Sequence, residues 1–152
     1  MKRTMVAVLL LFTAAFDSPR AMAQRDDAKR LVGTWRLVST TNAERGPHPT
    51  GILIYDARGN MAAQLQADRP RRKYAGSEPT PDEAKALLTS YLAYFGTYTV
   101  EEKAKTVTHH QTGNLNPDLK NNVRRYEFVG ANRLVLRPIE NQTELIWERI
   151  SP

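Results

Sequence analysis

Two adjacent histidines, His109 and His110, are the residues best suited to acid–base chemistry in this chain. They lie in a run rich in threonine and valine, which predicts a strand, and neighbouring side chains of a strand point to opposite faces. Only one histidine can therefore face inward. Beside Tyr98 and an arginine from Arg124-Arg125, it could polarise or deprotonate a bound molecule, because imidazole titrates near neutral pH. Alternatively, it only makes hydrogen bonds within the protein.

A second group of residues could form a pocket for a small molecule. In the run from Thr143 to Ile150, alternation places Leu145, Trp147 and Arg149 on one face. Aromatic and aliphatic side chains with a few polar groups are typical of ligand pockets. The residues that we expect to line the pocket are Leu53, Tyr55, Tyr98, His109, Tyr126, Leu136, Leu145 and Trp147. The same side chains could instead fill a solid core.

Other kinds of site find no support in the sequence. The chain has no cysteine, which excludes thiol catalysis, four-sulfur metal sites and disulfides. The third histidine, His48, lies in a proline-rich loop, and we expect no metal. No phosphate loop, dinucleotide fingerprint or Gly-x-Ser-x-Gly elbow is present, and we expect no cofactor. Much of the net charge of +6 falls in a short cluster from Arg69 to Lys73, which does not indicate a nucleic-acid partner.

The first 23 residues have the order of an export signal. Lys2 and Arg3 precede an apolar stretch that ends at Phe16, and Ala-Met-Ala at residues 21–23 is a small-x-small cleavage site. The apolar stretch is too short to span a bilayer. We therefore expect a signal peptide over residues 1–23 and one mature domain over residues 24–152. The mature protein would be periplasmic or secreted, with no stable membrane insertion.

Eight strand-like runs and one helix account for most of the remaining chain. The runs cover residues 32–41, 51–55, 61–66, 96–101, 105–111, 123–129, 132–137 and 143–150. After the third run, Thr80-Pro81-Asp82-Glu83 has the form of a capping box. Apolar residues at helical spacing predict a helix from Pro81 to about Tyr94, whose apolar face we expect to cover one end of the sheet structure. The sequence thus predicts an all-β, eight-stranded antiparallel barrel with one helix between the third and fourth strands.

Short motifs recur along this pattern in a characteristic order. They are Gly33-Thr34-Trp35, Pro49-x-Gly51, Gly59-Asn60-Met61, Tyr94-x-Gly96-x-Tyr98, His109-His110, Arg125-Tyr126 and Trp147-Glu148-Arg149. From about Leu31 to Ile150, the chain resembles the bacterial and fungal lipocalin-like domain family. The resemblance implies that Gly33, Trp35 and Arg149 close one end of the barrel, with Arg149 over the indole ring and Arg137 as the second choice. It also favours His109 as the inward histidine.

These observations predict a function in ligand binding. We expect an exported lipocalin-like protein that binds a small hydrophobic or amphipathic molecule inside the barrel. Two alternatives remain open. One is a small-molecule enzyme of the isomerase or cyclase type that uses His109 as acid or base. The other is a filled barrel that acts through its surface.

Overall fold

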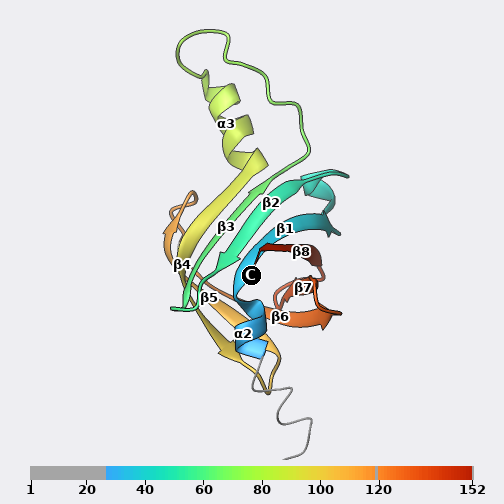
Figure 1. The fold of residues 1–152 in the computed structure, drawn as a ribbon. Coiled ribbons are helices and arrows are strands. Elements are labelled where there is room, and N and C mark those ends of the chain that lie inside the picture. Colours follow the sequence, from blue (N-terminus) through green and yellow to red (C-terminus); the bar gives the residue numbers. More distant parts are fainter. Residues whose placement is uncertain (1–26, 119, 152) are drawn as a thin grey trace, which may run out of the picture.

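Eight antiparallel strands close into a barrel in the order in which they follow along the chain (Figure 1). The computed structural model describes residues 27–118 and 120–151, so the predicted signal peptide lies outside the described residues. The strands are β1 (Gly33–Thr40), β2 (Thr50–Tyr55), β3 (Asn60–Gln66), β4 (Tyr91–Glu101), β5 (Thr106–Asn114), β6 (Asn121–Val129), β7 (Arg133–Pro138) and β8 (Leu145–Ser151). Helix α2 (Asp27–Leu31) precedes β1, a 3-10 turn η1 (Ala43–Arg45) follows it, and α3 (Pro81–Ser90) separates β3 from β4. The predicted fold class is confirmed.

The strand ladders define one inward face around the whole barrel. Leu53 of β2 lies opposite Trp35 of β1 and Ala63 of β3, and Ala63 in turn lies opposite Tyr94 of β4. Because side chains alternate along each strand, residues paired in this way point to the same side of the sheet. The pairing of β8 with β1 closes the ring and leaves no free edge. The inward side chains therefore form a single core that runs through the barrel.

Helix α3 begins as the sequence predicts and ends earlier. Thr80 Oγ1 accepts a hydrogen bond from Glu83 N at 3.3 Å, and the Glu83 carboxylate accepts one from Thr80 N at 2.8 Å, so the capping box is present. The helix ends at Ser90, however, and Tyr91 already pairs with Gln66 of β3. The predicted end near Tyr94 is wrong because strand pairing with β3 takes over the residues whose spacing also suits a helix.

The predicted covering role of this helix is also wrong. Figure 1 shows α3 and the loop before it projecting beyond the strands, where the helix continues the line of β4. Leu88 is 57% exposed, and Ser90 at the junction with β4 is the buried residue of the helix. The end of the barrel near α3 is therefore not covered by an apolar helix face. Within the described part of the chain, no helix is both long and apolar enough to cross a membrane.

Candidate functional site

His109 lies in the centre of the barrel with both ring nitrogens engaged. Its side chain is on the inward face of β5 and the residue is 1% exposed. Tyr55 Oη is 2.5 Å from His109 Nε2, and Tyr94 Oη is 2.9 Å from His109 Nδ1. His110 points to the other face, where its Nε2 lies 2.9 Å from Thr99 Oγ1. The structure thus places His109 inward, although its hydrogen-bond partners are Tyr55 and Tyr94 and not Tyr98.

The environment keeps His109 neutral and Tyr55 protonated. Burial, and next the positive charge of Arg124, hold the pKa of His109 well below its ordinary value. Burial also raises the pKa of the Tyr55 hydroxyl well above its ordinary value, and Tyr94 adds to this effect. Neither group therefore changes its charge near neutral pH. The constellation holds a set of neutral hydrogen bonds and does not supply a strong base.

Arg124 of β6 fixes the direction of these hydrogen bonds. Its Nη2 donates to Tyr94 Oη at 3.3 Å, because a guanidinium group has no acceptor. Tyr94 can then donate its own hydroxyl proton to His109 Nδ1. A neutral imidazole that accepts at Nδ1 carries its proton on Nε2, so His109 donates to Tyr55 Oη. Since both nitrogens of His109 are occupied, a substrate would have to displace a tyrosine before His109 could act as acid or base.

A small cavity lies beside Arg124, on the side of the barrel core away from α2. Its volume is about 20 Å³, which is room for one water molecule and not for an organic ligand without side-chain movement. The lining residues are Leu53, Ala63, Leu65, Leu92, Tyr94, His109, Arg124, Leu136, Leu145 and Trp147. The interior is therefore nearly filled, although Leu92 and Leu145 at the edge of the core are only partly buried.

One buried donor at this cavity lacks a hydrogen-bond partner, and a half-buried guanidinium group beside it has only one. Trp147 is 2% exposed, and its Nε1–H has no hydrogen-bond partner in the described part of the chain. A buried donor without an acceptor costs about 1–3 kcal/mol. The bond to Tyr94 is the one hydrogen bond that Arg124 makes among the described residues, and none of their carboxylates lies within ion-pair distance of it. The cavity thus offers hydrogen-bond donors and a positive charge to an acceptor.

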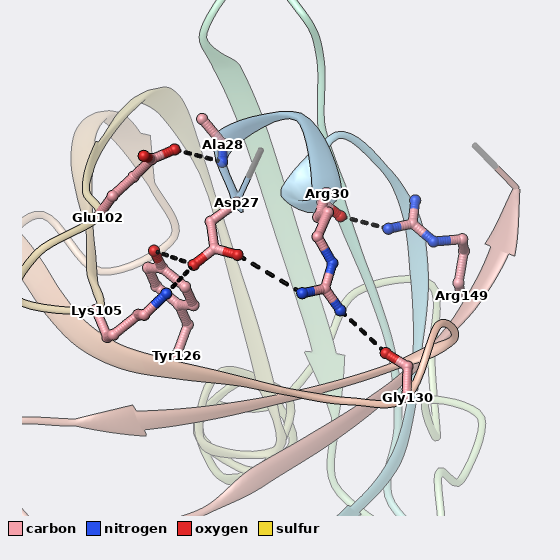
Figure 2. A network of polar contacts seen from close by, with 8 residues as sticks. All are labelled: Asp27, Ala28, Arg30, Glu102, Lys105, Tyr126, Gly130 and Arg149. Atoms are coloured by element: carbon pink, nitrogen blue, oxygen red, sulfur yellow. Dashed lines mark hydrogen bonds and ion pairs between the residues drawn. The ribbon is translucent and has the colours of Figure 1, made fainter. Parts of the chain in front are cut away.

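The opposite end of the barrel is closed by α2 (Figure 2). Asp27 is buried, forms an ion pair with Lys105 and accepts a hydrogen bond from Tyr126 Oη at 3.1 Å. Burial, and next the charge of Asp27, raise the pKa of Tyr126. Arg30 reaches across to the carbonyl of Gly130 at 3.0 Å. These contacts join α2 to the strands on both sides of it, so α2 is held across this end of the barrel.

The predicted closure residues meet at the same end. Trp35 is 0% exposed, and its Nε1 donates to the carbonyl of Leu31 in α2 at 2.9 Å. The guanidinium carbon of Arg149 lies 4.0 Å from the centre of the Trp35 ring, and Nη1 of Arg149 donates to the carbonyl of Val32 at 2.6 Å. Arg137, the second choice, instead forms ion pairs with Glu127 and Glu144 on the outer surface.

Comparison with protein families agrees with this architecture. A family model described as a lipocalin-like domain matches residues 32–150. The chain belongs to the lipocalin-like domain family. A search of curated proteins found no match to it. Membership of this family agrees with the closed barrel but does not identify a ligand.

Five of the eight predicted lining residues surround the cavity of this lipocalin-like barrel. These are Leu53, His109, Leu136, Leu145 and Trp147. The other three lie nearer to α2: Tyr55 and Tyr98 pack with ring centres 4.6 Å apart, and Tyr126 binds Asp27. The cavity is thus shorter than the predicted pocket, because these three tyrosines fill the half of the barrel next to the closed end.

The sequence interpretation missed several of the lining residues. The sequence predicts Leu92 and Tyr94 at the end of the helix, whereas the structure places both in β4, where Tyr94 is buried and the next residue, Phe95, is exposed. Ala63 and Leu65 could have been found by extending the alternation of Met61 along β3. Among the described residues, no group of three or more metal-ligating side chains is placed to hold a metal ion.

A larger depression lies outside the lipocalin-like barrel. It has a volume of about 730 Å³ and is open to solvent between residues 69–75 and α3. Its walls carry basic residues such as Arg71 and Lys85 together with the acidic residues Asp82 and Glu83. Because these side chains are exposed and of mixed charge, this depression lacks the buried donors that distinguish the interior cavity.

Proposed function

We propose that this lipocalin-like protein binds a small molecule inside the barrel, at the end opposite α2. The observation that carries the proposal is the cavity lined by Arg124 and Trp147, where the unpartnered buried Nε1–H of Trp147 and the half-buried guanidinium group of Arg124 lie among aliphatic side chains. Apolar walls with a few polar groups are the usual composition of a small-molecule site. The lipocalin-like fold supports the same function, because an eight-stranded barrel can hold one small ligand.

The ligand enters past Leu92 and Leu145 and displaces them from the cavity. Both residues are only partly buried, whereas the residues at the α2 end are tied by ion pairs and hydrogen bonds. Helix α3 projects beyond the strands and does not lie across the end of the barrel opposite α2. Burial of about 200 Å² of apolar ligand surface contributes roughly 5 kcal/mol before the costs of association, so such a ligand is expected to bind with modest affinity.

The protein is proposed to act outside the cytoplasm, in the periplasm or as a secreted protein. Residues 1–23 have the composition of a signal peptide, and the domain that follows contains no cysteine to be oxidised. N-terminal sequencing of the protein recovered from the periplasm or the medium tests this proposal. A mature protein that begins at Gln24 supports it, and one that retains Met1 contradicts it.

Titration with apolar probes tests the binding site. Fatty acids, terpenoids and aromatic dyes are added to the mature protein while tryptophan fluorescence is recorded. The expected result is a saturable change that disappears in Trp147→Phe, since Trp147 lines the cavity and Trp35 lies at the closed end. Leu88→Glu on the exposed side of α3 is the control and should bind as the native protein does. If no probe alters the native signal, the interior is a filled core and the proposal fails.

A further inference from the structure

We propose that the ligand of this cavity is a small carboxylic acid, whose carboxylate is bound by Arg124 with Trp147 Nε1 as the second donor. The inference rests on the proposed function, because it assigns a chemical class to the ligand of the same site. It is carried by three features of the cavity: an uncompensated charge, an unpartnered donor and an apolar wall.

The uncompensated charge is that of Arg124: no carboxylate of the described residues lies within ion-pair distance of it, and Glu140 attracts it only from farther away. Five of the other cationic side chains have a carboxylate within ion-pair distance, namely Arg30, Arg36, Lys105, Lys120 and Arg137. Exposed cations such as Arg58 and Lys73, and the half-buried Arg45 outside this cavity, also have none among the described residues. Arg149 lacks one but donates to the backbone carbonyls of Arg30 and Val32 at the closed end. Arg124 has only the hydrogen bond to Tyr94 in the described part of the chain. A guanidinium group turned toward a protein interior is costly unless an anion or several acceptors satisfy it.

Arg124 is also held in position to receive an anion. Tyr94 accepts its Nη2–H and is itself bound to His109, whose other nitrogen is bound to Tyr55. This series of hydrogen bonds uses one of the five N–H groups of the guanidinium and leaves the others for a ligand. Tyr94 and His109 are thus positioning residues for Arg124.

The unpartnered donor is the indole N–H of Trp147. It borders the same cavity as Arg124, and it lacks an acceptor there. A carboxylate has two oxygens that accept several hydrogen bonds in one plane, which suits the fork of a guanidinium group together with a further donor. A phosphate monoester carries more charge than the single cation of this site balances, so the site favours a monoanion.

The remaining wall determines the rest of the ligand. Among the described residues, no aspartate or glutamate lines the cavity. The side chains around the two donors are mainly aliphatic: Leu53, Ala63, Leu65, Leu92, Leu136 and Leu145. The free volume of about 20 Å³ allows only a slim group next to Arg124. The ligand is therefore a carboxylic acid with an unbranched or small apolar body, directed toward Leu92 and Leu145.

Three probes with the same apolar chain and different head groups distinguish the contribution of the head group to binding from that of the apolar body. Binding of octanoate, octanol and octyl phosphate is measured by calorimetry on the mature native protein, Arg124→Met, Arg124→Lys and Arg125→Met. Arg125 is the control, because it neighbours Arg124 in sequence and is exposed on the outer face. The native protein should bind octanoate at least about tenfold more tightly than octanol, which corresponds to about 1.4 kcal/mol. Arg124→Met should lose this preference and keep octanol binding, Arg124→Lys should retain part of it, and Arg125→Met should retain all of it.

Other results contradict the two proposals separately. Equal affinity for octanoate and octanol, unchanged in Arg124→Met, refutes the carboxylate assignment and leaves the binding function standing. Tighter binding of octyl phosphate than of octanoate refutes the choice of head group. If none of the three probes binds the native protein, this assignment fails, and the fluorescence titration with the wider panel then decides the proposed function. Should Arg124→Met not fold, the native comparison and Arg124→Lys decide the same question.

Discussion

Replacement of Trp35 by alanine tests the structural basis of the closed end. The side chain of Trp35 is 0% exposed, packs near Phe128, lies under Arg149 and donates a hydrogen bond to the carbonyl of Leu31. Truncation to alanine removes all of these contacts and leaves a cavity between β1 and α2. We expect Trp35→Ala to lower the free energy of unfolding by roughly 3–5 kcal/mol.

The magnitude follows from the area and the contacts that are lost. A buried tryptophan removes about 200 Å² of surface from water, which is worth roughly 5 kcal/mol at 25 cal/mol per Å². The unfolded chain already buries part of this area, which lowers the figure to about 3.5 kcal/mol. The hydrogen bond to Leu31 contributes about 1 kcal/mol more. The contact with Arg149 is worth up to about 1 kcal/mol, because that guanidinium is partly exposed.

Chemical denaturation of the mature protein gives the free energy of unfolding directly, and fluorescence of the remaining Trp147 follows the transition. The matched control is Val38→Ala, since Val38 lies on the same strand and is 44% exposed. Val38→Ala should change the free energy of unfolding by no more than about 0.5 kcal/mol. A loss below about 1 kcal/mol in Trp35→Ala, with an unchanged denaturant slope, would show that Trp35 is not packed at the closed end and would refute the assignment.

Three further changes test other parts of the structure. Because the pKa of His109 is depressed in the folded state, its neutral form contributes stability that is complete above about pH 7.5 and is lost as the pH falls. Between about pH 6.5 and 5.5, the free energy of unfolding of the native protein should fall by about 1 kcal/mol more than that of His109→Gln, and parallel profiles would contradict this. Gly96→Ala should lower the free energy of unfolding by at least about 2 kcal/mol, because the new Cβ would lie 2.0 Å from the carbonyl oxygen of His110. An unchanged melting temperature would show that β4 and β5 can move apart there. Asp27→Ala should lower the free energy of unfolding by about 1–2 kcal/mol and speed the hydrogen exchange of backbone amides in α2. Exchange at the native rate would mean that the ion pair with half-exposed Lys105 does not hold the helix in place.

Much of the fold could be predicted from local patterns. Alternation with a period of two placed Leu53 and Tyr55 on one face of their strand, and the structure shows that this face is the inward one. The same rule placed His109 and His110 on opposite faces of their strand. The start of α3 was predictable because the capping residues Thr80 and Glu83 satisfy backbone groups within one turn of the helix.

The end of that helix could not be predicted in the same way. Leu92 and Tyr94 have a spacing that suits either a helix or a strand, since both patterns bring apolar residues back at short intervals. Their state depends on β3, where Leu65 pairs with Leu92 and Ala63 pairs with Tyr94. Partners so distant in the sequence act only once the chain has folded.

The all-β class and the number of strands could be predicted from composition and periodicity along each stretch of chain. Periodicity also showed that His109 and His110 face opposite sides of their strand, but the structure was needed to show that His109 is the inward one. The meeting of four side chains at the centre depends on the folded barrel, because the strand registers bring together residues from β2, β4, β5 and β6: Tyr55, Tyr94, His109 and Arg124. The tertiary structure also decided the size of the cavity, which is the volume left after side chains from many strands have packed against one another. The donors that favour an acidic ligand were visible in the sequence as residue types, but their lack of acceptors is a property of the folded barrel alone.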